Sequence, residues 1–404
     1  MKIVHFVGNS DPVKIRGDHR HVLYLAKAQR RHGMNAVVVT TQHGLFFDLC
    51  QKDGIPVFVA DDLIADTPDS SPASEGTARA ARAPMQGIAA MEQVVAKLTE
   101  LSPEIIHCHN LHFAQVLVTA AEIIRIPCVL TLHTPDAYQA LHQAAAQKLK
   151  LTVIAVSKKE FETAQKTGTA DINVHYVPNG TPSAAYRQDQ CTPRVPSLMT
   201  VGSLEHRKGI DVAILAMTEL RQRHGSDCPS LNIYGEGPQG GYLIEMAKIL
   251  HLEDVVKFHG VQMDVWDRSR RSDVLIVPSR AETGPLTVLE AMSRGMATVS
   301  CEVGEVAEML PDQRYGRIVP VDSITALADA IDSMLTDVTS GHFNPDLVVG
   351  RHQAQYSIDT MADRISTVYQ SAIARLKEVP GRAAAPTAQR ARAHHEGLPP
   401  RPGW

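Results

Sequence analysis

Short runs of apolar, often β-branched residues alternate with longer segments of helical pattern along most of the chain. In the first half these runs contain few polar positions, which is typical of parallel strands covered by helices on both faces. A helix is expected over 18–31, where Asp18 is a candidate N-cap and Gly33 a stop signal. The predicted strands of this half are 2–7, 36–41, 56–60, 105–109, 128–132 and 152–156, and a further helix is predicted over 88–101.

The same alternation restarts in the second half, after a proline-containing segment at 188–197 that is interpreted as a linker. The predicted strands are 198–201, 230–234, 255–259, 274–277 and 297–300, and the predicted helices are 210–224, 241–250, 286–294 and 324–335. Repeated β-α-β units predict parallel sheets, so the fold class is α/β with two Rossmann-like parallel-sheet domains facing a central cleft. Ligands of open α/β sheets bind beyond the carboxyl ends of the strands, and we expect the chemistry in that cleft.

Two segments lack this pattern. Residues 61–87 are rich in Asp, Ser, Pro, Ala and Arg, and are interpreted as a long mobile loop. The end of the chain, 380–404, combines prolines and arginines with little apolar content, which predicts a disordered tail.

Composition narrows the class of protein. A length of 404 residues suggests two domains, and a net charge of −4 argues against nucleic-acid binding through bulk charge. The six cysteines form no CxxC pair, so neither a zinc site nor a disulfide framework is indicated. The longest apolar stretch, 116–132, contains Glu122 and Arg125 and is no transmembrane helix, and the apolar run at the start is too short for a signal peptide. We expect a soluble, cytoplasmic protein.

The most informative segment is 273–295, where a predicted strand is followed by a turn with Glu282 and a helix with Glu290. Pro285 suits the first position of that helix, and the free amides at a helix start favour an anion. Carboxylates beside a phosphate site are better suited to accepting hydrogen bonds from hydroxyl groups than to binding the phosphate itself. Each glutamate taken alone would be interpreted as a solvated surface residue.

A second segment, 198–211, places a glycine turn at Gly202 and Ser203 after a strand, and the cations Arg207 and Lys208 just before a helix. This arrangement can neutralise a phosphate, although a solvated basic pair is an equally good interpretation of the segment alone.

A third segment, 231–240, formally matches GxGxxG through Gly235, Gly237 and Gly240. A dinucleotide site should have an acidic residue at the end of the next strand, and 255–260 has none. Pro238 also fits such a loop poorly, so a dehydrogenase is disfavoured.

Together these segments resemble the retaining glycosyltransferases of family four, which have the two-domain GT-B fold. Glu282 and Glu290 match the E-x7-E signature, 202–209 resembles the G-x-L-x-x-x-K-G segment, and 235–238 resembles the G-x-G-P turn. Looser matches at 103–109, 131–134, 155–157 and 177–180 extend the resemblance to residues 1–375. It implies an N-terminal acceptor-side domain at 1–185, a nucleotide-sugar domain at 198–350 and a helix at 351–378 that packs back on the first domain.

The resemblance also implies roles for single residues. Glu282 would contact hydroxyls of the donor sugar, Glu290 would bind the ribose, and Lys208 would hold the diphosphate. The implied catalytic residues are His133, which reaches the sugar from the N-terminal domain, Lys208 and Glu282. The implied donor-binding residues are Gly17, Gly202, Ser203, Arg207, Lys208, Gly235, Val261, Glu282, Gly284, Pro285, Leu286, Thr287 and Glu290.

Two positions depart from the family pattern. Ser203 stands where many relatives have arginine, so Arg207 is expected to compensate. The Gly-Gly of the first loop is Gly17-Asp18 here, and Asp18 would place a carboxylate near the phosphates unless it turns away as a helix cap.

No metal and no cofactor are expected, because side-chain cations can stabilise the leaving phosphate and no DxD-like pair stands in a suitable place. Three neighbouring histidines, His107, His109 and His112, are a weak metal candidate and are interpreted as buried or cleft-lining residues.

The expected reaction is transfer of a sugar from a nucleotide-diphosphate sugar, a UDP-sugar on family frequency, to a hydroxyl of a saccharide, cyclitol, natural product or lipid-linked sugar. A nucleotide-sugar epimerase and a non-catalytic nucleotide-sugar-binding subunit remain as alternatives. The basic segment 14–32 is compatible with peripheral contact to an anionic membrane at the inner face, and a solvated helix face is the simpler interpretation.

Overall fold

The computed structural model describes residues 1–8, 15–60, 83–109, 111–134, 151–166, 172–184, 197–262, 265–268 and 273–377. The predicted tail at 380–404 and most of the predicted loop at 61–87 lie outside these residues. The last part of that loop belongs instead to helix α3, which begins at Ala83.

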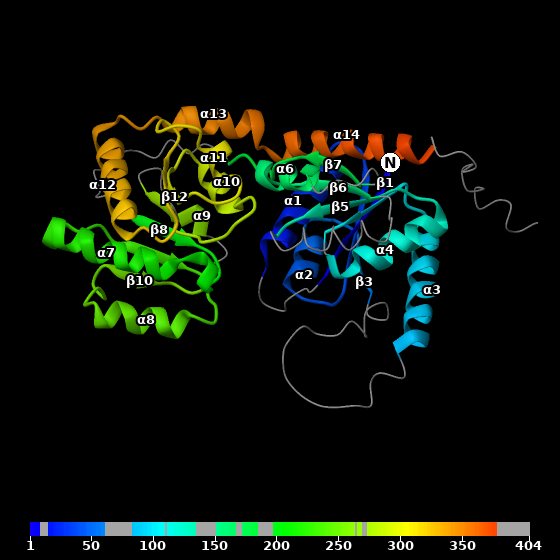
Figure 1. Cartoon of the computed structure of the whole chain (residues 1–404), viewed down its shortest axis with the longest axis horizontal. Coiled ribbons are helices and arrows are strands. Elements are labelled where there is room, and N and C mark those ends of the chain that lie inside the picture. The colour runs from blue at the N-terminus through cyan, green and yellow to red at the C-terminus, as the bar shows by residue number, and fades with distance from the viewer. Residues whose placement is uncertain are drawn as a thin grey trace, which may run out of the picture.

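The first part of the chain forms a seven-stranded, all-parallel sheet in the order β3-β2-β1-β4-β5-β6-β7 (Figure 1). Its strands are β1 (Lys2–Val7), β2 (Asn35–Thr40), β3 (Val57–Val59), β4 (Ile105–Cys108), β5 (Cys128–Leu132), β6 (Leu151–Ala155) and β7 (Ile172–Tyr176). The accompanying helices are α1 (Gly17–Arg31), α2 (Leu45–Lys52), α3 (Ala83–Leu101), α4 (Leu111–Ile124) and α6 (Lys158–Lys166).

The second part forms a six-stranded parallel sheet in the order β10-β9-β8-β11-β12-β13. Its strands are β8 (Leu198–Val201), β9 (Leu231–Tyr234), β10 (Val256–Phe258), β11 (Val274–Val277), β12 (Ala297–Cys301) and β13 (Arg317–Val319). The helical elements are η2 (His206–Lys208), α7 (Ile210–His224), η3 (Gly225–Asp227), α8 (Gly240–Ile249), α9 (Val265–Arg268), α10 (Leu286–Met292), α11 (Val306–Met309), α12 (Ile324–Ser340) and α13 (Pro345–Gln355).

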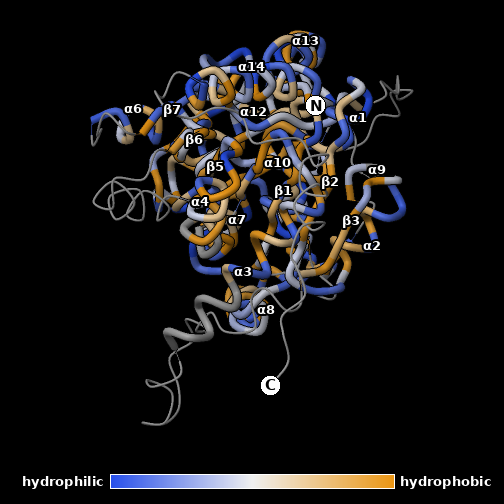
Figure 2. The backbone as a smooth tube through the Cα atoms, turned by 90° about the vertical axis from the view of Figure 1, so that its right-hand side faces the viewer, coloured by the Kyte–Doolittle hydropathy of each residue, from blue (hydrophilic) through white to orange (hydrophobic). Residues whose placement is uncertain are grey.

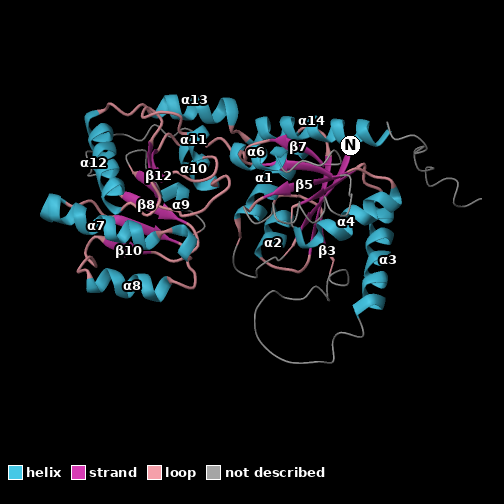
Figure 3. Ribbon diagram, viewed as in Figure 1, coloured by secondary structure: helices cyan, strands magenta, loops and turns pink. Residues whose placement is uncertain are grey.

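Helix α14 (Ile358–Lys377) returns from the second sheet to the first (Figures 1 and 3). Its apolar face, from Ile358 to Ala372, shares a buried core with Ile3 of β1, Leu25 of α1 and Ile105 of β4. Apolar residues fill the strands, and α14 buries an apolar face while its polar residues such as Asp363 and Gln370 are exposed, which is the pattern of a sheet covered by an amphipathic helix (Figure 2). Helix α8 differs, because its Tyr242, Ile244 and Ile249 are exposed.

The structure corrects the prediction for Asp18. The N-cap of α1 is Arg16, and Asp18 lies in the first turn, where it pairs with the Arg16 guanidinium at 2.6 Å. A carboxylate in the first turn is favoured by the helix dipole, so Asp18 is stable there without acting as the cap. The start of α10 differs in the same way, because Pro285 is the N-cap residue of that helix and not its first helical residue.

The basic segment of α1 is largely paired within the chain. Lys27 contacts Asp53, Arg31 contacts Asp359, and Arg20 contacts Glu290. These pairs leave the described part of this face little free positive charge, so the structure lends no support to the membrane hypothesis. Among the described residues, no helix is long and apolar enough to cross a bilayer.

Candidate active site

Two predicted site residues from different loops meet at the carboxyl ends of neighbouring strands. Lys208 follows β8 and Glu282 follows β11, and these two strands pair directly. The Lys208 Nζ lies 2.5 Å from Glu282 Oε1, which also accepts a 3.0 Å hydrogen bond from Ser279 Oγ. Arg207 Nη1 lies 3.7 Å from Glu282 Oε2. The proposed diphosphate cations and the proposed sugar carboxylate therefore share one site.

Close backbone packing explains the glycines of this site. Gly235 has φ +140°, and a Cβ there would lie 1.8 Å from the Gly202 carbonyl oxygen. Only glycine adopts this conformation without strain and allows the two loops to approach so closely. Ser203 stands beside Gly202, partly exposed, on the loop that leads to Lys208.

Arg280 holds the two charged loops together, and the sequence analysis did not select it. Its guanidinium donates to both carboxylate oxygens of Asp211, at 2.9 and 2.7 Å, and its backbone N–H donates to the Arg207 carbonyl. Such a two-pronged pair fixes orientation as well as charge. The signal in the sequence was Asp211, which follows the Lys208-Gly209 turn.

The first domain contributes His133 through a contact with the turn that carries Glu282. Thr283 Oγ1 donates a 2.7 Å hydrogen bond to the His133 carbonyl oxygen. Asn179 Nδ2 donates to the Gly284 carbonyl at 2.7 Å, and a Cβ on Gly284 would lie 2.9 Å from that nitrogen. Thr283 and Asn179 thus join the two domains at the candidate site.

Glu290 is buried, with 3% of its surface exposed, and its carboxylate faces the first domain. Oε1 lies 3.0 Å from Arg20 Nη1 and accepts a 3.1 Å hydrogen bond from the Tyr24 hydroxyl. Within the described residues, Oε2 is buried without a hydrogen-bond partner. One oxygen is therefore paired within the protein and the other has no partner among the described residues, a division that the sequence did not indicate.

The remaining predicted residues lie on three segments: the start of α10, the start of α1 and the turn after β10. Pro285, Leu286 and Thr287 form the start of α10, directly after Gly284. Gly17 is exposed at the first residue of α1, and Val261 is 44% exposed beyond β10. In the part of the chain that is described, no hydrogen bond links Gly17 or Val261 to the Lys208–Glu282 pair.

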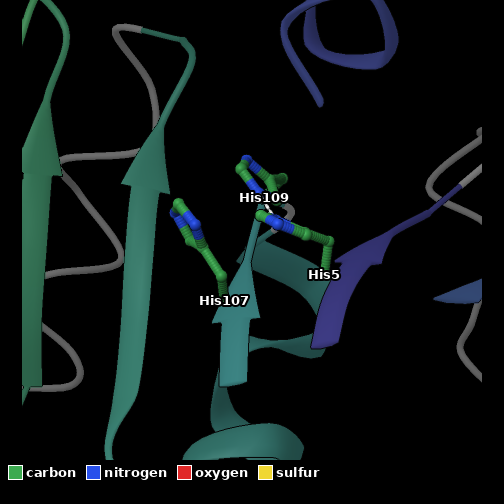
Figure 4. A group of neighbouring side chains, drawn as sticks. All are labelled: His5, His107 and His109. Atoms are coloured by element: carbon green, nitrogen blue, oxygen red, sulfur yellow. Dashed lines mark hydrogen bonds between the residues drawn. The ribbon is translucent and has the colours of Figure 1, made fainter. Parts of the chain in front are cut away.

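Histidines from several elements lie beside His133. His5 and His107 are partners in the β1–β4 register, and the His5 Nδ1 lies 3.0 Å from His109 Nε2 (Figure 4). His109 Nδ1 lies 3.2 Å from His133 Nε2, and the His21 and His133 rings meet edge to face. Burial lowers the pKa of His5 and of His133 to about 4, and it lowers the pKa values of His21, His107 and His109 as well. The cluster is neutral near pH 7.

Two groups in this cluster have the residue type and spacing of metal ligands: His5, His107 and His109, and His21, His109 and His133. Most of their ring nitrogens bond one another or neutral neighbours and are satisfied without an ion. His21 Nε2 is the exception, because it is buried without a hydrogen-bond partner among the described residues. The side chain of His112 lies outside the described part of the structure. His107 and His109 are buried, as predicted, whereas the partners His5 and His21 were not foreseen.

Comparison with known proteins agrees with this architecture. Residues 188–342 match the profile of the Glycosyl transferases group 1, and residues 15–184 match that of Glycosyltransferase Family 4. A glycogen synthase of Mycobacterium tuberculosis is 25% identical over 290 residues, covering 67% of this chain and 69% of that protein. An alpha-D-kanosaminyltransferase of Streptomyces kanamyceticus is 27% identical over 177 residues, covering 43% of this chain and 45% of that protein.

Solved structures show the same fold at low sequence identity. Anabaena HepE in complex with UDP and glucose aligns with a TM-score of 0.72 at 19% identity, covering 92% of this chain and 100% of that one. A glycosyltransferase from Rickettsia africae aligns with a TM-score of 0.71 at 15% identity, covering 92% and 98%. Two matched profiles that together span most of the chain, and the two parallel-sheet domains, lead to one conclusion: the chain belongs to the family 4, group 1 glycosyltransferases and has their GT-B fold.

Proposed function

We propose that the chain is a retaining, metal-independent transferase that moves a hexose from a UDP-sugar to a hydroxyl acceptor. The observation that carries the proposal is the convergence of Lys208, Arg207 and Glu282. Glu282 is next to Thr283, whose hydroxyl donates to the His133 carbonyl oxygen. A solved relative binds UDP and glucose, which favours a uridine donor. Acceptors in keeping with the family are saccharides, cyclitols, natural products and lipid-linked sugars.

In the proposed complex the diphosphate lies against Lys208 and Arg207, which neutralise the charge that grows as it leaves. Lys208 then exchanges its bond to Glu282 for bonds to phosphate, and the Glu282 carboxylate accepts hydrogen bonds from the sugar. Glu290 Oε2, which has no hydrogen-bond partner among the described residues, accepts a hydrogen bond from a ribose hydroxyl. The pairing of Lys208 with Glu282 compensates both charges before the donor binds.

The proposed reaction is balanced without a metal. The bond from the anomeric carbon to the phosphate oxygen breaks, a bond to the acceptor oxygen forms on the same face, and the acceptor proton passes to the departing phosphate. The side-chain cations and the partly buried site replace the stabilisation that water would give. We therefore expect activity in EDTA.

The test is a product assay by proton NMR with UDP-glucose and UDP-N-acetylglucosamine, in EDTA, with and without a panel of hydroxyl acceptors. The proposal predicts an acceptor-dependent glycoside whose anomeric configuration equals that of the donor. Lys208→Ala should lose turnover, while Lys248→Ala, which removes an exposed lysine on α8, should retain it. Free sugar released equally well without acceptor would favour the epimerase, and no turnover despite nucleotide binding would favour a non-catalytic subunit.

We propose a cytoplasmic location for this activity, because nucleotide sugars are made and used there by many enzymes of this class.

A further inference from the structure

One face of the first sheet carries a row of buried polar side chains beneath helix α14. The apolar core on this face contains Ile3, Ile105 and Val129, and the next positions facing the same way on β1, β4 and β5 are His5, His107 and Thr131. Gln29 of α1 and Tyr369 of α14 cover this row, and both are fully buried. Buried polar groups of this kind must satisfy one another, so every donor has to face an acceptor and the direction of each hydrogen bond is fixed.

The order starts at the Gln29 amide. Its Nε2 donates to the Tyr369 hydroxyl oxygen at 3.1 Å, so its Oε1, 2.7 Å from His5 Nε2, is an acceptor. His5 must therefore carry its proton on Nε2. Because burial keeps this imidazole neutral, His5 Nδ1 is a bare lone pair.

The same reasoning continues toward the candidate site. His5 Nδ1 can only accept, so His109 donates to it from Nε2 across 3.0 Å. His109 is neutral, which leaves its Nδ1 as an acceptor for the Nε2 proton of His133 across 3.2 Å. His133, held through its backbone by Thr283, then has a bare Nδ1. This nitrogen is the end of a directed chain that begins at Gln29.

A second branch leaves the same amide in the other direction. The Tyr369 hydroxyl accepts from Gln29 and donates to His107 Nδ1 at 2.6 Å, and His107 Nε2 donates to Thr131 Oγ1 at 2.7 Å. This branch ends away from His133. It gives an internal control, because a change at Thr131 disturbs the buried row without reversing the first branch.

We propose that Gln29, His5 and His109 are positioning residues that fix His133 in its Nε2–H tautomer, so that His133 offers an Nδ1 lone pair to a hydroxyl of the donor sugar. The functional half of this inference rests on the proposed donor site. A nitrogen without a proton accepts a hydrogen bond from a hydroxyl. The opposite tautomer would present an N–H at the same place and would disfavour the orientation of the sugar that directs a hydroxyl proton toward His133. The relay therefore links the choice of sugar to a buried glutamine of α1, three hydrogen bonds away from His133.

The test combines NMR of the resting protein with steady-state kinetics. Two-bond 15N–1H spectra of histidine-labelled full-length protein report each tautomer, with His133 assigned from a His133→Gln variant. We expect His133 as Nε2–H in the wild type and in Thr131→Val. In Gln29→Met, which is similar in volume and lacks the amide, we expect a shift toward Nδ1–H or a mixture.

In the donor assay, Gln29→Met should lower kcat about five- to tenfold with little change in KM, the effect expected when one neutral hydrogen bond in the transition state is lost. Thr131→Val should not. If Gln29→Met fails to fold, Tyr369→Phe replaces it, because the freed amide can then flip and should also yield a mixture of tautomers.

An unchanged His133 tautomer in Gln29→Met, or an equal change in Thr131→Val, overturns the relay. A tautomer shift without a kinetic effect overturns its link to the sugar. A wild-type protein with the expected tautomer but no turnover of any donor refutes the proposed function instead, so the two failures are distinguishable.

Discussion

Glu290→Ala tests whether one buried carboxylate serves both the domain contact and the nucleotide. Glu290 Oε1 is occupied by Arg20 and Tyr24, and Oε2 is buried without a partner in the described structure. A ribose hydroxyl that donates to Oε2 would form a hydrogen bond to a charged group, which contributes about 1.5–3 kcal/mol. The expected loss of affinity for UDP is therefore roughly 10- to 150-fold.

This loss alone would be ambiguous, because the alanine also leaves the partly buried Arg20 guanidinium without its carboxylate. A cycle with two ligands separates the effects. UDP and 2′,3′-dideoxy-UDP would each be titrated by calorimetry into wild type and into Glu290→Ala. Both ligands meet the same altered domain contact in the variant, but only UDP has the ribose hydroxyls. The contact term cancels, and the remaining coupling energy measures the ribose interaction.

The account predicts a coupling of about 1.5–3 kcal/mol, since the dideoxy ligand lacks the hydroxyls that would donate to Glu290 and therefore loses only the shared contact term. Glu253→Ala, an exposed glutamate before β10, is the matched control and should give no coupling. A coupling below about 0.5 kcal/mol for Glu290 would refute the ribose assignment and leave Glu290 as a purely interdomain residue.

Three further predictions concern folding and metal. Burial raises the pKa of Glu305 to about 7, above its ordinary 4.5. Its contribution to the free energy of unfolding therefore falls as pH rises from 4.5 to 7 and is constant above pH 7. Glu305→Gln lacks this loss, so its free energy of unfolding in urea should rise by about 3 kcal/mol relative to that of the wild type between pH 4 and pH 8. Gly235→Ala should lower the free energy of unfolding by about 1–3 kcal/mol and abolish nucleotide binding, because its Cβ would overlap the Gly202 carbonyl. The control is Gly241→Ala, which has open space at its Cβ and should not destabilise the protein. Treatment with EDTA should leave the transfer rate unchanged.

Each of these has a result that would count against it. A Glu305→Gln protein whose stability relative to wild type is the same at both pH values would show that Glu305 is ionised in the fold with an ordinary pKa. A Gly235→Ala protein that binds nucleotide normally would mean that the two glycine loops can separate freely. A rate that falls in EDTA and returns with a divalent cation would contradict the metal-free mechanism.

The sequence predicted the repeating architecture because buried parallel strands are continuous apolar runs. Strands such as β1, β5 and β11 stand out for this reason. Strand β7, Ile-Asn-Val-His-Tyr, was missed because it is the edge of its sheet and alternates polar with apolar residues. Strand β13 is only three residues long and begins with Arg317, too short for a periodic signal.

The same distinction applies to the site. Lys208 and Glu282 could be placed together from the sequence because both follow predicted parallel strands, whose carboxyl ends meet at one edge. The partners of Glu290 could not be predicted, because Arg20 and Tyr24 lie in the other domain and the local sequence contains nothing about domain packing. His5 and Gln29 were missed for a similar reason: a single polar residue in a strand or helix gives no sign of which distant side chain it will face.

The central claim is that Lys208 and Glu282 form a nucleotide-sugar site, and calorimetry tests it most directly. UDP, GDP and ADP, followed by UDP-glucose, UDP-N-acetylglucosamine and GDP-mannose, would be titrated without metal into wild type and Lys208→Ala. The account predicts selective binding of UDP and one UDP-sugar to wild type and its loss in Lys208→Ala. Absence of binding by every nucleotide, or binding that Lys208→Ala leaves intact, would contradict it.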